Sequence, residues 1–294
     1  MRFSTPCASP RDLGPHRDYP ARMRGLPQRL INTPEIEIWP AGLLRARGNH
    51  DARAIARARH VLRRKRDGRY LAADLPEGLQ PLVWQLRLEA GLDDALGALE
   101  SEVMHRRPGL EHVRTLPLDR LHDRLAQLGL AQESYAARTG LSLVAEPDWL
   151  ALAGFDRYRR PLWLHNDAAR AWLHMREGAL REGVVLEAIS GYRSHDYQLG
   201  IFERKRARGL SVDEILNVNA APGFSEHHSG LALDIGTPGE PPAEESFEHT
   251  AAFAWLRSHA GTYGFHMSYP RDNPHGIVYE PWHWAWRAHD PGGL

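Results

Sequence analysis

SEHHSGLALD, residues 225–234, leads into the segment that organises the second half of this chain. Between residues 231 and 235, apolar residues alternate with small or polar ones, a period of two that predicts a half-buried β-strand. Asp234 therefore projects from the strand face opposite the leucines, and His227 lies in the loop that leads into the strand. The segment would thus bring a carboxylate close to an imidazole.

A second segment, YEPWH at residues 279–283, adds another imidazole and another carboxylate. His227, Asp234 and His283 would offer three ligands to a zinc ion and leave its fourth position open, as in catalytic zinc sites. Glu280 stands three residues before the last ligand, and a carboxylate there is the proton acceptor that catalytic water requires. Either segment by itself could arise by chance in a chain with 17 His. Their combination indicates a zinc hydrolase with one catalytic ion.

Four segments stand in order along the chain: SGYRS at 190–194, YQ at 197–198, SEHHSG at 225–230 and EPWH at 280–283. Together they resemble the VanY-like branch of the D-alanyl-D-alanine carboxypeptidase family of zinc peptidases, over roughly residues 144–289. The resemblance implies zinc bound by His227, Asp234 and His283, with Glu280 as the catalytic base. It also implies that the substrate peptide is held by Arg193, Gln198 and Ser225. His228 stands where many relatives carry Gln.

The reaction that the resemblance implies is removal of the C-terminal D-alanine from peptidoglycan stem peptides, a D,D-carboxypeptidase activity. Arg193 offers a planar, permanently charged fork that suits a terminal carboxylate or a developing oxyanion, and the sequence leaves both open. An L,D-carboxypeptidase, a D-Ala-D-Ala dipeptidase and a non-catalytic, zinc-stabilised peptidoglycan-binding module are the alternatives. Glu280 favours an enzyme, because a module that only binds peptides needs no carboxylate beside the metal.

The spacing of Glu280 and His283 requires a bend in the chain. In a regular strand, residues three apart point to opposite faces. Pro281 makes the residue before it extended and can itself begin a helical turn. We therefore expect a bend at 281–282 that turns both side chains toward one metal. Alternating tryptophans at 282, 284 and 286 fit core filling better than walls of the site.

Composition excludes several classes of protein. Lys plus Arg equals Asp plus Glu at 37 each, so no overall field favours a nucleic-acid partner. Cys7 is the single cysteine, which excludes an internal disulfide and a multi-cysteine zinc site. No stretch is long and apolar enough to span a bilayer. Residues 1–20 lack the apolar core of a secretory signal, so the expectation is cytoplasmic as written, or periplasmic or wall-facing if an export signal is missing. Oligomeric state is not readable.

Three parts of the chain differ in character. Residues 1–40 are rich in proline and predict a tail with little fixed structure. Residues 41–143 predict a helical region of unknown role, in which leucines at 118, 121, 125 and 128 recur at helical spacing. Residues 144–294 predict the catalytic domain. Its expected fold class is α+β, with a small, mainly antiparallel sheet carrying the site and helices packed on one side.

Local signals predict the elements of this domain. A helix is expected over 166–183, with its apolar stripe formed by Ala169, Trp172, Leu173 and Leu180, and a buried strand over 184–189. Ser194 is placed as the N-cap of a helix that carries Gln198 and ends near Gly209. A later helix passes through residues 253–263 and stops at Gly264. Residues 265–269 and 277–280 predict the two strands of a hairpin.

Overall fold

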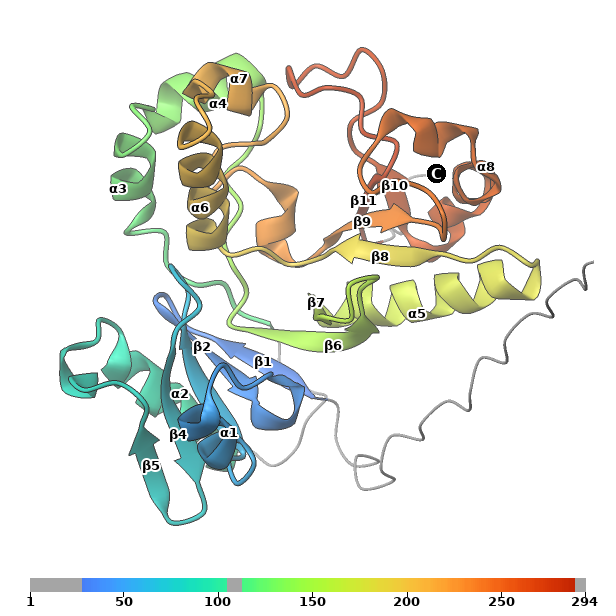
Figure 1. The fold of residues 1–294 in the computed structure, drawn as a ribbon. Helices are drawn as coiled ribbons and strands as arrows, with labels where there is room; N and C mark the ends of the chain where they lie inside the picture. The colour runs from blue at the N-terminus through green and yellow to red at the C-terminus, as the bar shows by residue number, and fades with distance from the viewer. Residues whose placement is uncertain (1–27, 105–112, 289–294) are drawn as a thin grey trace, which may run out of the picture.

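The computed structural model describes residues 28–104 and 113–288, in which strands assemble into two antiparallel sheets. The larger sheet has the strand order β5-β4-β3-β2-β1-β6-β7, and the smaller one has the order β10-β11-β9-β8. Helices α3, α4, α6 and α7 gather above the N-terminal strands in Figure 1, while α8 packs beside the smaller sheet. The predicted α+β class with a small antiparallel sheet is confirmed.

The larger sheet joins strands from both halves of the chain. Its members are β1 (Arg29–Asn32), β2 (Ile36–Pro40), β3 (His60–Arg64), β4 (Tyr70–Leu75), β5 (Gly78–Pro81), β6 (Trp149–Phe155) and β7 (Pro161–Leu164). β1 pairs with β2 on one side and with β6 on the other, with Leu30 opposite Leu150. The division expected at residue 144 remains a prediction, but the backbone hydrogen bonds of this sheet cross it.

The expectations for the N-terminal part are wrong in two respects. Residues 29–40 form two buried strands, so the described end of the predicted tail is ordered; residues 1–27 lie outside the described chain. Residues 60–81 form three strands rather than helices. The strand β3 was not predicted from the sequence, because charged residues such as its arginines are unusual in the interior of a sheet. Here Arg63 pairs with Glu37 at 2.5 Å, and Arg64 pairs with Glu89 at 2.7 Å.

Helices do occur in the N-terminal part. They are α1 (Asn49–Ile55), α2 (Leu92–Met104), α3 (Leu121–Ala126) and α4 (Gln132–Thr139). The predicted leucine stripe is confirmed as core: Leu121, Leu125 and Leu128 are buried against Phe202 and Phe224 of the catalytic part. Since apolar burial stabilises by about 25 cal/mol per Å², this contact attaches α3 firmly to α6 (His195–Arg206) and its neighbour α7 (Val212–Leu216).

The core of the catalytic part lies among β6, β7, α5 (Asn166–Arg181), the smaller sheet and α8 (Ala251–His259). Helix α5 presents Ala169, Trp172, Met175 and Ala179 to this core. The predicted stripe is wrong at two positions, because Leu173 and Leu180 are exposed. Apolar side chains lie on two faces of this helix. The face that packs on the core is the one that carries Trp172 together with small residues.

The smaller sheet consists of β8 (Glu187–Ser190), β9 (Ala232–Gly236), β10 (Phe265–Met267) and β11 (His283–Trp286). The hairpin expected between 265–269 and 277–280 is wrong, because β10 pairs with β11 instead. Trp284 of β11 is buried in the core, which favours that strand as the partner. Residues 277–280 run alongside, with Val278 N donating to Asn217 O and Glu280 N donating to Tyr269 O. None of the described helices is both long and apolar enough to cross a membrane.

Candidate metal centre and active site

Three ligand groups meet at one end of the smaller sheet. His227 lies in a short 3-10 helix (Glu226–Ser229), and Asp234 and His283 lie directly opposite each other on β9 and β11. Asp234 Oδ1 is 3.2 Å from His227 Nε2 and 3.2 Å from His283 Nδ1, and all three residues are buried. Tetrahedral bonds of about 2.0–2.1 Å to one zinc place ligand atoms about 3.3 Å apart. All three ligand atoms lie within 4.8 Å of one another. The donor set and its spacing therefore fit a zinc ion.

The outer nitrogen of each imidazole is bound, which orients the ring. His227 Nδ1 donates to Gly191 O at 2.7 Å, and His283 Nε2 lies 2.8 Å from Glu226 Oε2. The inner nitrogens, His227 Nε2 and His283 Nδ1, are left facing Asp234. Partners of this kind select the tautomer and raise the basicity of a metal ligand. Glu226 was not predicted from the sequence, because no spacing rule links it to a histidine 57 residues later.

Two glycines allow the chain to reach this arrangement. Gly230 ends the 3-10 helix with φ +70°, and a Cβ there would lie 2.8 Å from the backbone nitrogen of His165. A Cβ on Gly191 would lie 2.9 Å from Trp163 O, so only glycine lets this segment pack on β7. The bend predicted at 281–282 is confirmed, since His283 N donates to Glu280 O at 3.1 Å.

Glu280 stands beside the three ligand groups, with Oε2 3.8 Å from His283 Nδ1. Burial raises the pKa of Glu280 to about 7, and the carboxylates of Asp234 and Glu226 add to the increase, while His283 and Arg193 oppose it. A divalent cation at the triad would lower this pKa again, because positive charge favours the carboxylate. Glu280 is thus the titratable carboxylate of the site that is not committed to orienting a ligand.

The ligand groups themselves are strongly perturbed by burial and by each other. Burial lowers the pKa of His227 to about 4, and the charge of Arg193 contributes. Burial alone would lower the pKa of His283, but its hydrogen bonds to Asp234 and Glu226 raise it to about 10. The Asp234 carboxyl is held well below its usual pKa by the two histidines, against the effect of burial.

The three residues expected to hold substrate lie around the same cavity. A cavity of about 290 Å³ is lined by Arg193, Gln198 and Ser225 together with Glu280 and the ligand groups. Gln198 Nε2 donates to Ala220 O at 2.8 Å, so part of its amide is already occupied. Arg193 has no acid partner among the described residues, and its Nε is buried without a hydrogen bond. The guanidinium is therefore the group in this cavity most in need of an acceptor.

Other lining residues were not anticipated from sequence. Tyr269 packs its ring on His283 with centroids 4.8 Å apart, and burial raises the pKa of its hydroxyl, which therefore stays protonated. Trp282 also lines the cavity, whereas Trp284 fills the core as expected. Lys205 contributes a second cation. These residues come from segments far apart in sequence, which spacing patterns do not bring together.

The backbone of residues 191–193 connects the candidate metal ligands to Arg193, which lines the cavity. Besides accepting from His227 at Gly191 O, this segment donates from Arg193 N to His227 O at 3.2 Å. Arg193 O accepts from His228 Nδ1 at 2.6 Å, and His228 Nε2 accepts from Gly223 N at 3.1 Å. Burial lowers the pKa of His228 well below its usual value, so it remains neutral and donates once and accepts once. A glutamine amide has the same two capacities.

A buried carboxylate holds this segment from the other side. Glu146 accepts hydrogen bonds from His195 N at 2.8 Å, from Tyr192 OH at 2.5 Å and from Asn32 Nδ2 at 3.3 Å. Its charge is balanced by Lys65 Nζ at 2.5 Å, a side chain with 0% exposure. Lys65 follows β3 and Asn32 ends β1, so the N-terminal strands supply both a counter-ion and a hydrogen-bond donor behind the site.

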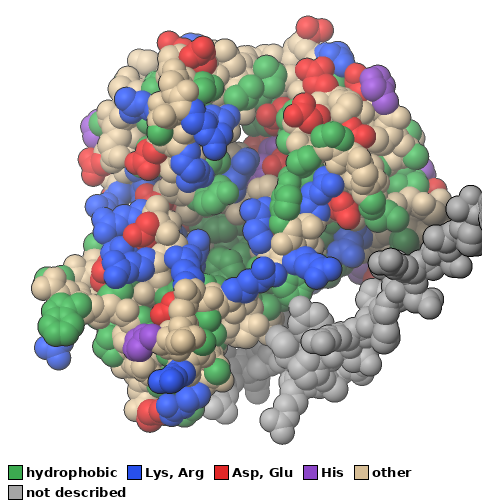
Figure 2. All heavy atoms as spheres, viewed as in Figure 1, with side chains coloured by type: hydrophobic (Ala, Val, Ile, Leu, Met, Phe, Trp, Pro, Cys, Tyr) green, Lys and Arg blue, Asp and Glu red, His purple; other side chains and the backbone are tan. Residues whose placement is uncertain are grey.

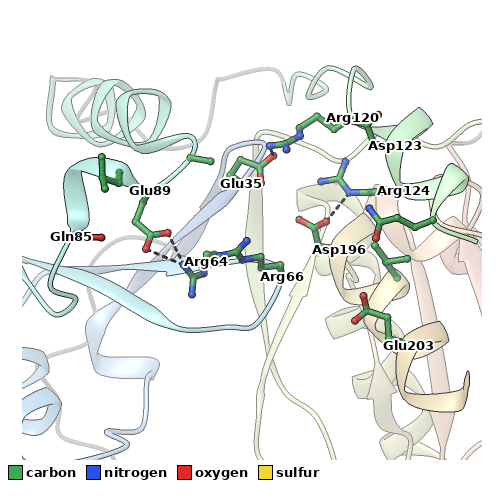
Figure 3. Close-up of a pocket in the computed structure, with 14 residues that line it drawn as sticks. Glu35, Arg64, Arg66, Gln85, Glu89, Arg120, Asp123, Arg124, Asp196 and Glu203 are labelled. Atoms are coloured by element: carbon green, nitrogen blue, oxygen red, sulfur yellow. Dashed lines mark hydrogen bonds and ion pairs between the residues drawn. The ribbon is translucent and has the colours of Figure 1, made fainter. Parts of the chain in front are cut away.

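A separate cavity of about 580 Å³ lies between the N-terminal strands and helices α3 and α6 (Figure 3). On one wall Arg64 binds Glu89 at 2.7 Å, and on the other Arg124 binds Asp196 at 2.7 Å. None of the three ligand groups lines it. Since these charges are paired with each other, this cavity is not the candidate site.

The similarity to known proteins lies in the half of the chain that carries the candidate site. The family model described as D-alanyl-D-alanine carboxypeptidase matches residues 161–289. Putative carboxypeptidase YodJ of Bacillus subtilis is 36% identical over 133 residues, covering 44% of this chain and 48% of that protein. The bifunctional D-Ala-D-Ala dipeptidase and D-Ala-D-Ala carboxypeptidase VanXYC of Enterococcus gallinarum is 31% identical over 148 residues, covering 48% and 75%.

Among solved structures, the LdcB LD-carboxypeptidase matches with 32% sequence identity and a TM-score of 0.42. The match covers 45% of this chain and 64% of the solved chain. The chain spans about half the length of the YodJ relative. The N-terminal strands β1–β5, which supply Lys65 and Asn32, lie outside the residues that the family model matches.

Proposed function

The chain belongs to the VanY family of D-alanyl-D-alanine carboxypeptidases, and from this premise we propose that it is a zinc-dependent D,D-carboxypeptidase acting on peptidoglycan stem peptides. The observation that carries the proposal is the position of Glu280. This carboxylate is 12% exposed, lies beside the three ligand groups, lines the cavity and takes no part in the hydrogen bonds that orient the histidines. A protein that only binds peptides has no use for such a group.

The proposed roles follow from the geometry. His227, Asp234 and His283 would hold the metal through Nε2, a carboxylate oxygen and Nδ1, the atoms that face one another. A zinc ion held there would supply Lewis-acid chemistry toward water and a carbonyl oxygen. Glu280 would accept a proton from the attacking water and deliver it to the leaving amine, because its carboxylate lies beside the three ligand groups and lines the cavity. Glu226 and the carbonyl of Gly191 keep the two imidazoles in the required orientation.

Arg193 binds oxygen atoms of the substrate, either the terminal carboxylate or the oxyanion that develops at the scissile carbonyl. Its guanidinium has free donors and faces the cavity without an acid partner among the described residues. Ser225 and the remaining capacity of Gln198 orient the peptide backbone. Gln198 and Ser225 are buried, which strengthens the electrostatic contacts that their polar groups make.

The test is release of D-alanine by the purified zinc protein from three substrates: a pentapeptide ending in D-Ala-D-Ala, a tetrapeptide ending in one D-Ala, and the free dipeptide. Preferential cleavage of the pentapeptide is expected; preference for the tetrapeptide or dipeptide would assign L,D-carboxypeptidase or dipeptidase activity instead. Glu280→Gln should retain zinc and lose about 10²–10⁴-fold in rate. Glu203→Gln, an exposed acid on α6 outside the cavity, is the matched control and should be unaffected. Stoichiometric zinc without release from any substrate would favour a binding module.

A further inference from the structure

A second cleft borders the active-site cavity and shares Arg193 with it. This aromatic–cationic cleft, of about 160 Å³, lies where the N-terminal strands meet residues 190–194. The N-terminal part contributes Glu37 and Trp39 from β2, Arg63 from β3 and Lys65 just after it, and the other lining residues, including Trp163 of β7, come from the catalytic part. In Figure 2, Lys and Arg side chains gather around a hollow with an apolar floor, between the N-terminal lobe and the rest of the molecule.

The floor of the cleft is aromatic. Trp39 packs edge-on against the buried Trp163, with ring centroids 5.2 Å apart and planes at 87°. Glu37 holds the Trp39 indole through Nε1 at 2.8 Å, so this ring is fixed before any ligand arrives. Tyr197 on α6 is 44% exposed and forms part of the opposite wall. Rings held in this way offer flat apolar area to a ligand at little entropic cost.

The walls of the cleft favour a ligand with oxygen acceptors. Four cationic side chains line it against two acidic ones, and Glu146 behind the wall neutralises Lys65. The remaining charge excess is that of Arg193. Arg63 uses Nη1 for Glu37, and Arg160 uses Nε and one Nη for Asp156 and Ile189 O. Because a guanidinium has five N–H donors, both arginines keep donors for a ligand.

The position of Arg193 connects this cleft to the reaction. A peptide whose C-terminus lies in the metal cavity must leave that cavity on its upstream side, and Arg193 lines both spaces. Resting on the proposed function, we propose that the aromatic–cationic cleft binds the substrate upstream of the cleaved bond and selects peptides that carry a carboxylate there. Trp39 and Arg63 lie outside the matched residues 161–289, so this selection is a property of the N-terminal strands of this chain.

The experiment compares two labelled peptides of equal length that end in D-Ala-D-Ala and differ only in Glu or Gln upstream. Binding to zinc-loaded Glu280→Gln protein is measured by fluorescence anisotropy, so the comparison does not depend on turnover. The Glu peptide should bind about 10-fold more tightly, the size of one charge-assisted hydrogen bond. Arg63→Met in the same background should remove most of this preference. Arg69→Met, an exposed arginine just before β4, should leave it intact.

Equal binding of both peptides to the Glu280→Gln protein would overturn the inference. The same conclusion would follow if the preference survived Arg63→Met in a protein that melts normally. A separate arm gives wild type a short acylated D-Ala-D-Ala that ends before the cleft. Failure to cleave it counts against the proposed function alone, whereas the anisotropy comparison still decides the role of the cleft.

Discussion

Replacing Lys65 with methionine should destabilise the protein and disturb the segment that carries Arg193. The lysine side chain has 0% exposure and lies 2.5 Å from Glu146, whose side chain is 4% exposed. Removing one partner of a buried pair leaves an uncompensated charge and costs about 3–5 kcal/mol. We expect the lower end, about 3 kcal/mol, because Tyr192 and His195 still donate to the carboxylate. For a chain of this size that corresponds to a fall in Tm of roughly 6–12 °C.

A double-mutant cycle isolates the pair. Lys65→Met together with Glu146→Gln removes both charges while keeping similar volumes, so it should be more stable than Lys65→Met alone. Thermal unfolding would be followed by circular dichroism on zinc-loaded protein at pH 7, with D-alanine release measured on the same samples. In the single variant, activity should fall although zinc content is unchanged, because residues 191–193 lose their support.

Two results would refute this reasoning. A loss below about 1 kcal/mol in Lys65→Met would mean that the pair is not buried or not coupled as the distances indicate. A double variant as unstable as the sum of the two singles would mean that Lys65 and Glu146 act independently. Arg69→Met, which removes a nearby exposed cation, is the control for a general effect of lost charge.

Three further outcomes are expected. Glu226→Ala should weaken zinc binding about 10–100-fold with the ligands intact, which competition with a chromophoric chelator measures; unchanged affinity would mean that His283 needs no such partner. Free zinc at 1,000 times its Kd should stabilise the folded protein by about 4 kcal/mol. Removing the zinc should therefore lower the melting temperature, and adding it back should restore it. Lys65 and the other donors hold the pKa of Glu146 below its unfolded value despite burial, so this carboxyl stabilises the fold above its unfolded pKa and that contribution is lost as pH falls through the folded pKa. In Lys65→Met the loss on acidification should begin at a higher pH, as a pH series of melting temperatures would show.

Local sequence was sufficient where the physical cause is itself local. The period of two at 231–235 predicted β9, and the Ser194 hydroxyl does accept from Tyr197 N as the predicted N-cap. The bend at 281–282 followed from the conformational limits that Pro281 imposes. The four motifs identified the family because they lie within one continuous half of the chain. Each of these inferences depends on residues only a few positions apart.

Pairing over long sequence distances was not predictable in the same way. Residues 277–280 were predicted as the strand partner of 265–269, but residues 283–286 pair with 265–267, and Trp284 of that strand is buried in the core. The arginines of the strand at 60–64 are neutralised by ion pairs with Glu37 and Glu89, which lie far from them in sequence. Local propensity cannot rank such alternatives, because their free energies differ through tertiary contacts.

The sequence by itself determined which residues are available for a metal, a base and a peptide, since zinc chemistry restricts ligands to a few residue types and the motifs kept them in order. Only the tertiary structure decided how they are held. Glu226 meets His283 across 57 residues, and Lys65 meets Glu146 across 81, because the register of two sheets brings these positions together. It also placed Trp39 and Arg63 in the same cleft as Arg193, where the N-terminal strands meet the catalytic part. Burial made those contacts obligatory: a charge removed from water needs a partner, whichever part of the chain provides it.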